Sequence, residues 1–311
     1  MTTRELLYIK TIDDERSLTR AAQKLYVTQP SLSHCVAVLE QQLGTKLFRR
    51  TSGGLLLTYA GEKYYRMACE VLRVYHAFEA EISDESALAR GRVTFGITNY
   101  LATDHLPRML PAFNRAHPGI ELRVLEETTD QMEKSLLSGR LDFAIMHTGA
   151  GDGASEDPGL AHEVLSRDPF LIAAPPDTPY AAAPRGDQSP PELDPARLDG
   201  EPFLMVSKGQ RIRHVADRVL AQAGVTPQVV FESRNYETLR RLAAQGMGYA
   251  FVPRQYVGLL GGEDYRPQYF AIPQKYAAYW ELSVVTLKDA YLSRAARAFL
   301  RSFREDIQGG E

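Results

Sequence analysis

Residues 17–61 have the sequence SLTRAAQKLYVTQPSLSHCVAVLEQQLGTKLFRRTSGGLLLTYAG, in which a short break separates two helical segments. Ser17 is a good cap for a first helix, whose apolar face includes two small alanines. Thr28 is placed to cap a second helix, because Pro30 then falls in its first turn, where a missing N–H costs nothing. Gly44 favours the end of that helix, so the segment predicts a helix-turn-helix.

The predicted second helix has an apolar face and a polar face. Its apolar residues are spaced four, three and four positions apart and form one stripe for the first helix: Leu32, Val36, Leu39 and Leu43. The opposite face carries short or polar side chains: Gln29, Ser31, Ser33, His34, Ala37 and Gln41. Such a helix fits the major groove of DNA, where these side chains bond base edges or phosphates. A small helical core with a solvated outer face explains the same pattern, so spacing alone leaves both open.

The residues after the second helix predict a two-stranded wing. Two apolar segments, Leu47–Phe48 and Leu55–Leu57, flank a pair of glycines that favours a turn. Arg49 and Arg50 lie at the base of this wing and are placed to reach the DNA backbone or the minor groove.

Length and composition exclude several classes of protein. A chain of 311 residues suggests two or three domains, and 44% hydrophobic with 24% charged residues is typical of a soluble globular protein. No segment approaches the roughly 20 apolar residues of a membrane-spanning helix, and the N-terminus has no continuous apolar run typical of a secretory signal. Two cysteines, Cys35 and Cys69, exclude a disulfide framework and a four-cysteine zinc site. We therefore expect a cytoplasmic protein without membrane partners.

The net charge of −3 is unevenly distributed along the chain. Residues 1–60 contain eight Lys or Arg and five Asp or Glu, whereas the remaining 251 residues contain 28 and 34. This basic head on an acidic body hints at a polyanionic partner at one end of the molecule.

Residues 58–89 predict a long helix, because they contain no proline and only one glycine. Large apolar side chains recur about every 3.5 residues, which is the period of a helix that pairs along a seam: Tyr64, Ala68, Val71, Tyr75, Phe78 and Ile82. A long helix packed on its own domain is the alternative. We expect self-association, because the helix lies between two predicted domains and its seam carries large aromatic residues.

The rest of the chain predicts two α/β lobes with a ligand cleft between them. Strand and helix patterns alternate from residue 91 onward, and residues 164–271 repeat the plan of the first unit, which favours largely parallel sheets. Ligands bind in such folds where parallel strands end. Polar residues follow three predicted strands of the first unit, at Thr98–Asn99, Thr128 and Thr148, and Ser207 follows one in the second. For any single one of these, a helix cap or a turn residue is an equally good interpretation.

The ordered series of motifs in residues 17–61 resembles the N-terminal domain of LysR-type transcriptional regulators. The matching pieces are Ala21-Ala22 with Leu25, Val27 to Ser31, Ser33, Leu39-Glu40, Leu43-Gly44, Leu47 to Arg50, Leu57-Thr58 and Ala60-Gly61. The resemblance implies that the following residues contact DNA: Thr28, Gln29, Pro30, Ser31, Ser33, His34 and Arg50. The family often has Arg and Gln where this chain has His34 and Cys35, which puts its base preference and phosphate affinity in doubt.

The same resemblance implies an architecture for the whole chain. It consists of a winged helix-turn-helix at 1–58, a linker dimerisation helix at 59–90 and a two-lobed, type II periplasmic-binding-protein-like effector domain of the α/β class. Lobe I covers 91–163 and is completed by 272–306, and lobe II covers 164–271. The implied effector-binding residues are Thr98, Asn99, Tyr100, Thr128, Thr148, Phe203 and Ser207. The implied function is sequence-specific regulation of a promoter operator in double-stranded DNA under control of a small-molecule effector. A homodimer that pairs into a homotetramer is implied as well.

Two other classes of function, a solute-binding protein and an enzyme, are less consistent with the sequence. A periplasmic solute-binding protein also has two lobes, but it needs export and gives the basic head no role. An enzyme is disfavoured because the chain has no HExxH, P-loop, GxSxG or CxxC motif, and Gly246-Met247-Gly248 precedes a predicted strand instead of following one. His34 and Cys35 do not predict a metal site, because adjacent helical residues point in different directions. We therefore expect no catalytic residues, no metal and no cofactor.

Overall fold

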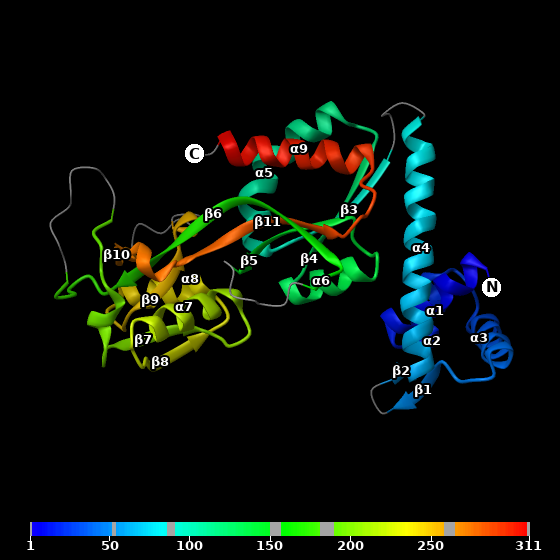
Figure 1. Cartoon of the computed structure of the whole chain (residues 1–311), viewed down its shortest axis with the longest axis horizontal. Helices are drawn as coiled ribbons and strands as arrows, with labels where there is room; N and C mark the ends of the chain where they lie inside the picture. Colours follow the sequence, from blue (N-terminus) through cyan, green and yellow to red (C-terminus); the bar gives the residue numbers. More distant parts are fainter. Residues whose placement is uncertain are drawn as a thin grey trace.

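The computed structural model describes residues 2–51, 54–85, 91–149, 157–180, 190–257 and 265–309. A small helical head and one long helix lie at one end of the molecule, and a larger α/β body lies at the other (Figure 1). Residues 86–90, at the predicted end of the linker helix, fall outside the described ranges.

The head is a winged helix-turn-helix preceded by one further helix. Its elements are α1 (Thr3–Glu15), α2 (Leu18–Lys24), α3 (Gln29–Leu43), β1 (Phe48–Thr51) and β2 (Gly54–Leu57). The predicted caps are confirmed: the side chain of Ser17 accepts from the Arg20 amide, that of Thr28 accepts from the Ser31 amide, and Gly44 ends α3 with a φ of 65°. Helix α1 was not predicted from the sequence. It buries Leu6, Ile9 and Ile12 and supplies the third side of the core of the head.

The long helix α4 (Tyr59–Glu85) has two halves with different surroundings. Tyr64 and Ala68 are buried against the head, so these two members of the predicted seam pack on the chain's own domain. The next members of the seam behave differently: Val71, Tyr75 and Phe78 are 39%, 43% and 57% exposed. The head therefore covers the first part of the stripe and leaves the next part exposed, because a helical stripe does not specify what covers each part of it.

The body contains mixed helix and sheet. Its elements are β3 (Gly91–Ile97), α5 (Asn99–Ala116), β4 (Ile120–Glu126), α6 (Thr129–Leu137), β5 (Phe143–Gly149), β6 (Leu160–Ala174), β7 (Pro202–Val206), α7 (Arg211–Gln222), β8 (Gln228–Ser233), α8 (Tyr236–Ala244), β9 (Ala250–Pro253), β10 (Gln268–Ala271), β11 (Tyr279–Leu287) and α9 (Arg294–Gly309), with short 3-10 turns at Pro195–Leu198, Arg254–Tyr256 and Gln274–Tyr276.

Two hydrophobic cores on opposite faces of one sheet build lobe I. Strand β3 pairs in parallel with β4 and β5, and β11 pairs antiparallel with β5. Helices α5 and α9 cover one face, where Phe95 stacks on Phe143 and the tilted ring of Phe299 packs against both. Helix α6 covers the other face with Met132 and Leu136. Since both faces are covered, β5 is an almost continuous apolar strand.

Lobe II has a separate core, and two long strands join it to lobe I. Strands β7 and β8 are parallel, while β9 and β10 pair antiparallel with the second half of β6. Phe170, Phe203 and Phe251 are buried in this core. Strands β6 and β11 pair with each other and pass from one lobe to the other (Figure 1). These two crossings place the ends of the parallel strands of the two lobes on either side of a cleft.

Candidate DNA-binding face and ligand cleft

The N-terminal turns of α3 present a row of polar side chains. Gln29, Pro30, Ser31 and His34 are exposed and Ser33 is half-buried. Behind this row, Leu32 and Leu39 are buried against the core, which fixes the orientation of the helix. Leu43 departs from the predicted stripe, because it is 45% exposed at the last residue of the helix.

A buried carboxylate fixes α3 to the wing. Glu40 is 8% exposed, and its Oε1 accepts hydrogen bonds from the Leu47 amide at 2.8 Å and the Phe48 amide at 3.4 Å. Its Oε2 pairs with Lys46 Nζ at 2.6 Å. Arg50 extends from β1 and is exposed, with no carboxylate partner among the described residues. The polar row of α3 and the arginine of the wing are therefore held in one rigid arrangement.

A cavity of about 830 Å³ lies between the two lobes. Five of the seven predicted effector residues line it: Thr98, Asn99, Tyr100, Thr128 and Ser207. Thr98 and Thr128 are the N-cap residues of α5 and α6, so they line the cavity and begin helices at the same time. The ends of these strands thus bring together residues from distant parts of the sequence.

The other two predicted effector residues lie elsewhere. Phe203 is fully buried in the core of lobe II, because β7 is covered on both faces. Thr148 is 8% exposed, and its hydroxyl bonds the Ser283 hydroxyl at 2.9 Å and the Glu281 carbonyl at 3.3 Å. Neither residue lines the cavity among the described residues.

Besides the predicted Tyr100, aromatic side chains that the sequence did not single out line the cavity: Tyr236, Tyr256 and Trp280. Tyr100 packs on Tyr236 with ring centroids 4.4 Å apart, and Tyr236 stacks on Tyr256 at 5.2 Å. The only tryptophan of the chain, Trp280, stacks on His147 at 3.8 Å. These residues come from α5, α8, the turn after β9, β11 and β5, so no local motif could have indicated their meeting.

His147 is held as a neutral imidazole next to the cavity. Burial lowers its pKa, although the neighbouring Asp168 opposes this effect. Its Nε2 lies 2.9 Å from Asp168 Oδ2, and the same oxygen accepts from Gln255 Nε2 at 3.0 Å. Since an ionised carboxylate only accepts, Nε2 carries the proton and Nδ1 is the acceptor for the Tyr256 hydroxyl at 3.4 Å.

Two polar contacts connect the lobes across the cavity. The hydroxyl of Tyr100 in lobe I donates to Asn235 Oδ1 in lobe II at 2.8 Å. Arg211 Nη2 at the start of α7 donates to Glu133 Oε1 on α6 at 2.9 Å. The structure therefore holds the two lobes in direct contact around the cavity.

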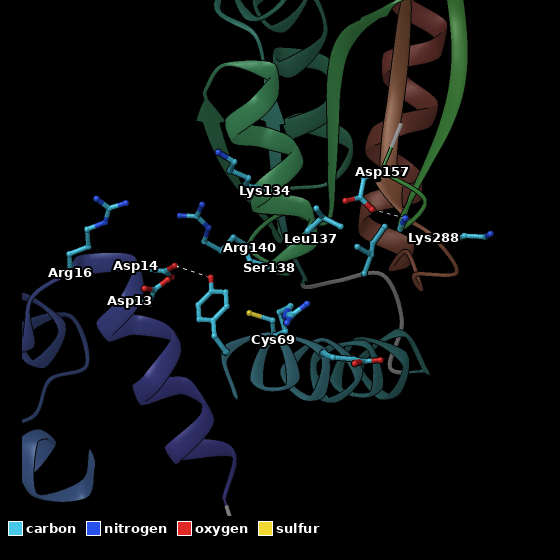
Figure 2. A pocket seen from close by; sticks show the side chains of 15 residues that line it. Asp13, Asp14, Arg16, Cys69, Lys134, Leu137, Ser138, Arg140, Asp157 and Lys288 are labelled. Carbon is cyan, nitrogen blue, oxygen red and sulfur yellow. Dashed lines mark hydrogen bonds between the residues drawn. The ribbon is translucent and has the colours of Figure 1, made fainter. Parts of the chain in front are cut away.

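A second cavity, of about 850 Å³, lies between the head, α4 and lobe I (Figure 2). Asp13 and Asp14 of α1 line one side, and Arg140 and Lys134 of lobe I line another. The Tyr65 hydroxyl of α4 donates to Asp14 at 3.3 Å. Burial and the neighbouring Asp14 raise the pKa of Asp13. The carboxylates of Asp13 and Asp14 thus face basic side chains of lobe I across the cavity, which Arg16 of the head and Asp157 of lobe I also line.

The described ranges contain neither a cluster of metal-ligating side chains nor a membrane-spanning helix. Within them, no group of three or more His, Cys, Asp or Glu side chains is arranged to hold a metal ion. No helix in these ranges combines the length and the apolar composition needed to cross a bilayer.

Comparisons with known proteins agree with both halves of this architecture. Residues 3–62 match the model of the bacterial regulatory helix-turn-helix proteins of the lysR family, and residues 86–308 match the LysR substrate binding domain. A hydrogen peroxide-inducible genes activator from Dickeya chrysanthemi is 31% identical over 253 residues, which is 81% of this chain and 79% of that relative.

Solved structures extend the likeness over the whole chain. Full-length OxyR from Pseudomonas aeruginosa superposes with a TM-score of 0.75 at 23% identity, covering 99% of this chain and 95% of that one, which shows a common fold. HinK, a LysR family transcriptional regulator from the same organism, superposes with a TM-score of 0.59 at 26% identity and covers 98% of both chains. The family model of the larger domain covers more than half of the sequence. The chain therefore belongs to the LysR family of bacterial helix-turn-helix transcriptional regulators.

Proposed function

We propose that this LysR-type regulator reads an operator with the N-terminal turns of α3 and the wing, under control of an effector bound between the lobes. The observation that carries the proposal is the polar row of α3, which is exposed while the opposite side of the same helix is sealed in the core. A helix held in this way can enter the major groove without rearrangement of the head.

Each residue of the proposed DNA face has a chemical role. Gln29, Ser33 and His34 are placed on the helix to bond base edges, and the Ser31 hydroxyl suits a phosphate near the helix N-terminus. Thr28 caps the start of the helix with its side chain. Pro30 lies in the first turn, where its lack of an N–H costs no hydrogen bond within the helix. Arg50 supplies a phosphate or minor-groove contact from the wing.

The exposed half of α4 supports assembly into a dimer. Val71, Val74, Tyr75 and Phe78 are between 39% and 57% exposed and recur at helical spacing. A second copy of α4 would cover this stripe and hold two heads side by side, so a two-fold operator is expected. We further propose that dimers pair into tetramers, that the domain boundaries lie at residues 58, 90, 163 and 271, and that the protein acts in the cytoplasm.

The proposed effector binds without thiol chemistry. Relatives of this chain include hydrogen peroxide-inducible activators, and protein thiols are the usual groups that peroxide oxidises. Both cysteines of this chain, Cys35 and Cys69, lie outside the matched effector domain. We therefore propose reversible binding to Thr98, Asn99, Tyr100, Thr128 and Ser207, and no catalytic step.

Fluorescence anisotropy on DNA from upstream of the gene tests the DNA face. Ser33→Glu combined with Arg50→Glu places negative charge in the interface and should weaken binding by a hundredfold or more. The matched control is Gln222→Glu with Arg301→Glu, which changes the net charge equally at exposed positions of the body. Equal binding by the first double variant and the wild type would mean that another surface reads the DNA.

A further inference from the structure

The charged residues that line the cavity between the lobes are divided by sign. Every cavity-lining carboxylate belongs to lobe I, namely Glu126, Glu127 and Asp130. Every cavity-lining Lys or Arg belongs to lobe II, namely Lys208, Arg211 and Arg234. Both sides of the cavity consist of residues that the structure describes. A bound molecule thus meets an acidic wall and a basic wall that face each other.

One ion pair joins the two lobes beside the cavity, between Arg211 of the basic wall and Glu133, which lies behind the acidic wall and is not part of the cavity lining. Arg211 of lobe II and Glu133 of lobe I are 2.9 Å apart, and their side chains are only 18% and 14% exposed. Burial raises the pKa of Glu133 although Arg211 opposes this, and the nearby Asp130 and Asp157 add to the increase. The contact therefore holds the lobes together, but the glutamate in it is poorly solvated and surrounded by like charge.

Arg211 also has unused hydrogen-bonding capacity. Its Nε is buried and has no partner among the described residues, while Nη2 is bonded to Glu133. A guanidinium has five N–H donors in a planar fork that suits a carboxylate. Arg211 lines the cavity, so a ligand carboxylate there can replace Glu133.

Replacement by a simple anion would leave Glu133 charged, largely buried and unpaired. Breaking a buried pair by removing one partner is strongly unfavourable, because the other charge loses its compensation. A zwitterion avoids this penalty, since its carboxylate pairs with Arg211 and its ammonium group pairs with Glu133 or Asp130. The opposed walls therefore favour a ligand that carries both charges.

The aromatic lining of the cavity indicates what kind of side chain the ligand carries. Tyr100, Tyr236 and Trp280 present aromatic surface, and the Trp280 indole N–H and the Tyr236 hydroxyl are buried without partners among the described residues. A flat ring fits such an aromatic surface. A volume of about 830 Å³ is ample for one amino acid.

We propose that the effector is a free amino acid with a ring-bearing side chain, and that it exchanges with the Arg211–Glu133 pair to change the contact between the lobes. This inference rests on the proposed function, because it assumes that the cavity is the effector site. In this proposal, Arg211 and Glu133 select a zwitterion. The regulatory step is the replacement of the bond between these two side chains by bonds to the ligand.

Isothermal titration of the full chain tests the charge selection. The probes are phenylalanine, tyrosine, tryptophan and histidine, each with its decarboxylated amine and its deaminated acid. At least one amino acid should bind, and its amine and its acid should each bind tenfold or more weakly. Binding of an acid or an amine as tightly as the amino acid, or of no amino acid in the set, would overturn the proposal.

Variants of the pair provide a second readout. Arg211→Gln and Glu133→Gln keep the shapes of the side chains and should each weaken amino acid binding at least tenfold. Arg123→Gln and Glu121→Gln break an exposed pair of 2.9 Å on β4 and should leave binding unchanged. Unchanged binding in the first two variants would contradict the proposal. DNA binding measured in parallel separates the outcomes, since intact operator binding would leave the proposed function standing.

Discussion

The position of the wing relative to α3 depends on Glu40, which makes its substitution a direct test of how the head is built. Glu40→Ala removes the acceptor for the Leu47 amide and the partner of Lys46. Glu40→Gln retains an acceptor of similar shape but loses the charge. Lys46→Met removes only the ion pair. These three variants separate the buried hydrogen bonds from the exposed charge.

The geometry gives the expected order of effects. A hydrogen bond to a charged acceptor contributes about 1.5–3 kcal/mol, and the 2.8 Å contact with the Leu47 amide is the well-formed one. The 3.4 Å contact with Phe48 adds less. The Lys46 side chain is 75% exposed, so solvent screens its pair and we assign it at most about 1 kcal/mol. We expect losses of about 2–4 kcal/mol for Glu40→Ala, about 1–2 for Glu40→Gln and under about 1 for Lys46→Met.

Native-state hydrogen exchange at the Leu47 amide of the full chain is the suitable assay, because it reports opening of this corner without requiring two-state unfolding of a multidomain protein. Protection should fall in the order Lys46→Met, Glu40→Gln, Glu40→Ala. The wing is held by the same bonds, so DNA affinity should fall in that order too. A Lys46→Met variant as strongly affected as Glu40→Ala would refute the assignment of the energy to the buried bonds.

Three further predictions address other parts of the chain. Gly61→Ala should destabilise the head by several kcal/mol, because its Cβ would lie 2.0 Å from the Leu47 carbonyl oxygen; thermal unfolding followed by circular dichroism measures this, and a neutral effect would contradict the close contact. Phe78→Asp with Val74→Asp should convert dimers to monomers in sedimentation velocity while the head stays folded, and persistent dimers would place the interface elsewhere. His147 has a folded-state pKa below its ordinary value of 6.5, so its contribution to stability is complete above that pH and declines as pH falls toward the folded pKa. The free energy of unfolding, measured by denaturation, should therefore decrease more between pH 8 and pH 5.5 in the wild type than in His147→Gln. Equal decreases in the two proteins would disprove this role.

The helix-turn-helix could be predicted from the sequence, because its signals are local. Ser17, Thr28 and Gly44 act on the backbone within a few residues of themselves, so the caps and the helix end follow from residue type and spacing. The ends of the parallel strands also identified part of the cavity. Thr98 follows β3 directly and Thr128 comes two residues after the end of β4, and these two strands pair with each other in parallel. Helix α1 was missed although Leu6, Ile9 and Ile12 recur at helical spacing on its buried face, so its signal was present in the sequence.

The tertiary structure decided which faces are covered and which distant charges meet. Tyr64 and Phe78 belong to one stripe of α4, yet the head buries the first and leaves the second exposed. Phe203 lies in a strand covered on both faces and is buried, whereas Ser207 lies just beyond the end of that strand and lines the cavity. Glu133 and Arg211 are 78 residues apart and meet because the crossing strands bring α6 and α7 together. A sequence pattern fixes the local path of the backbone, whereas burial and charge pairing depend on what that path encounters in space.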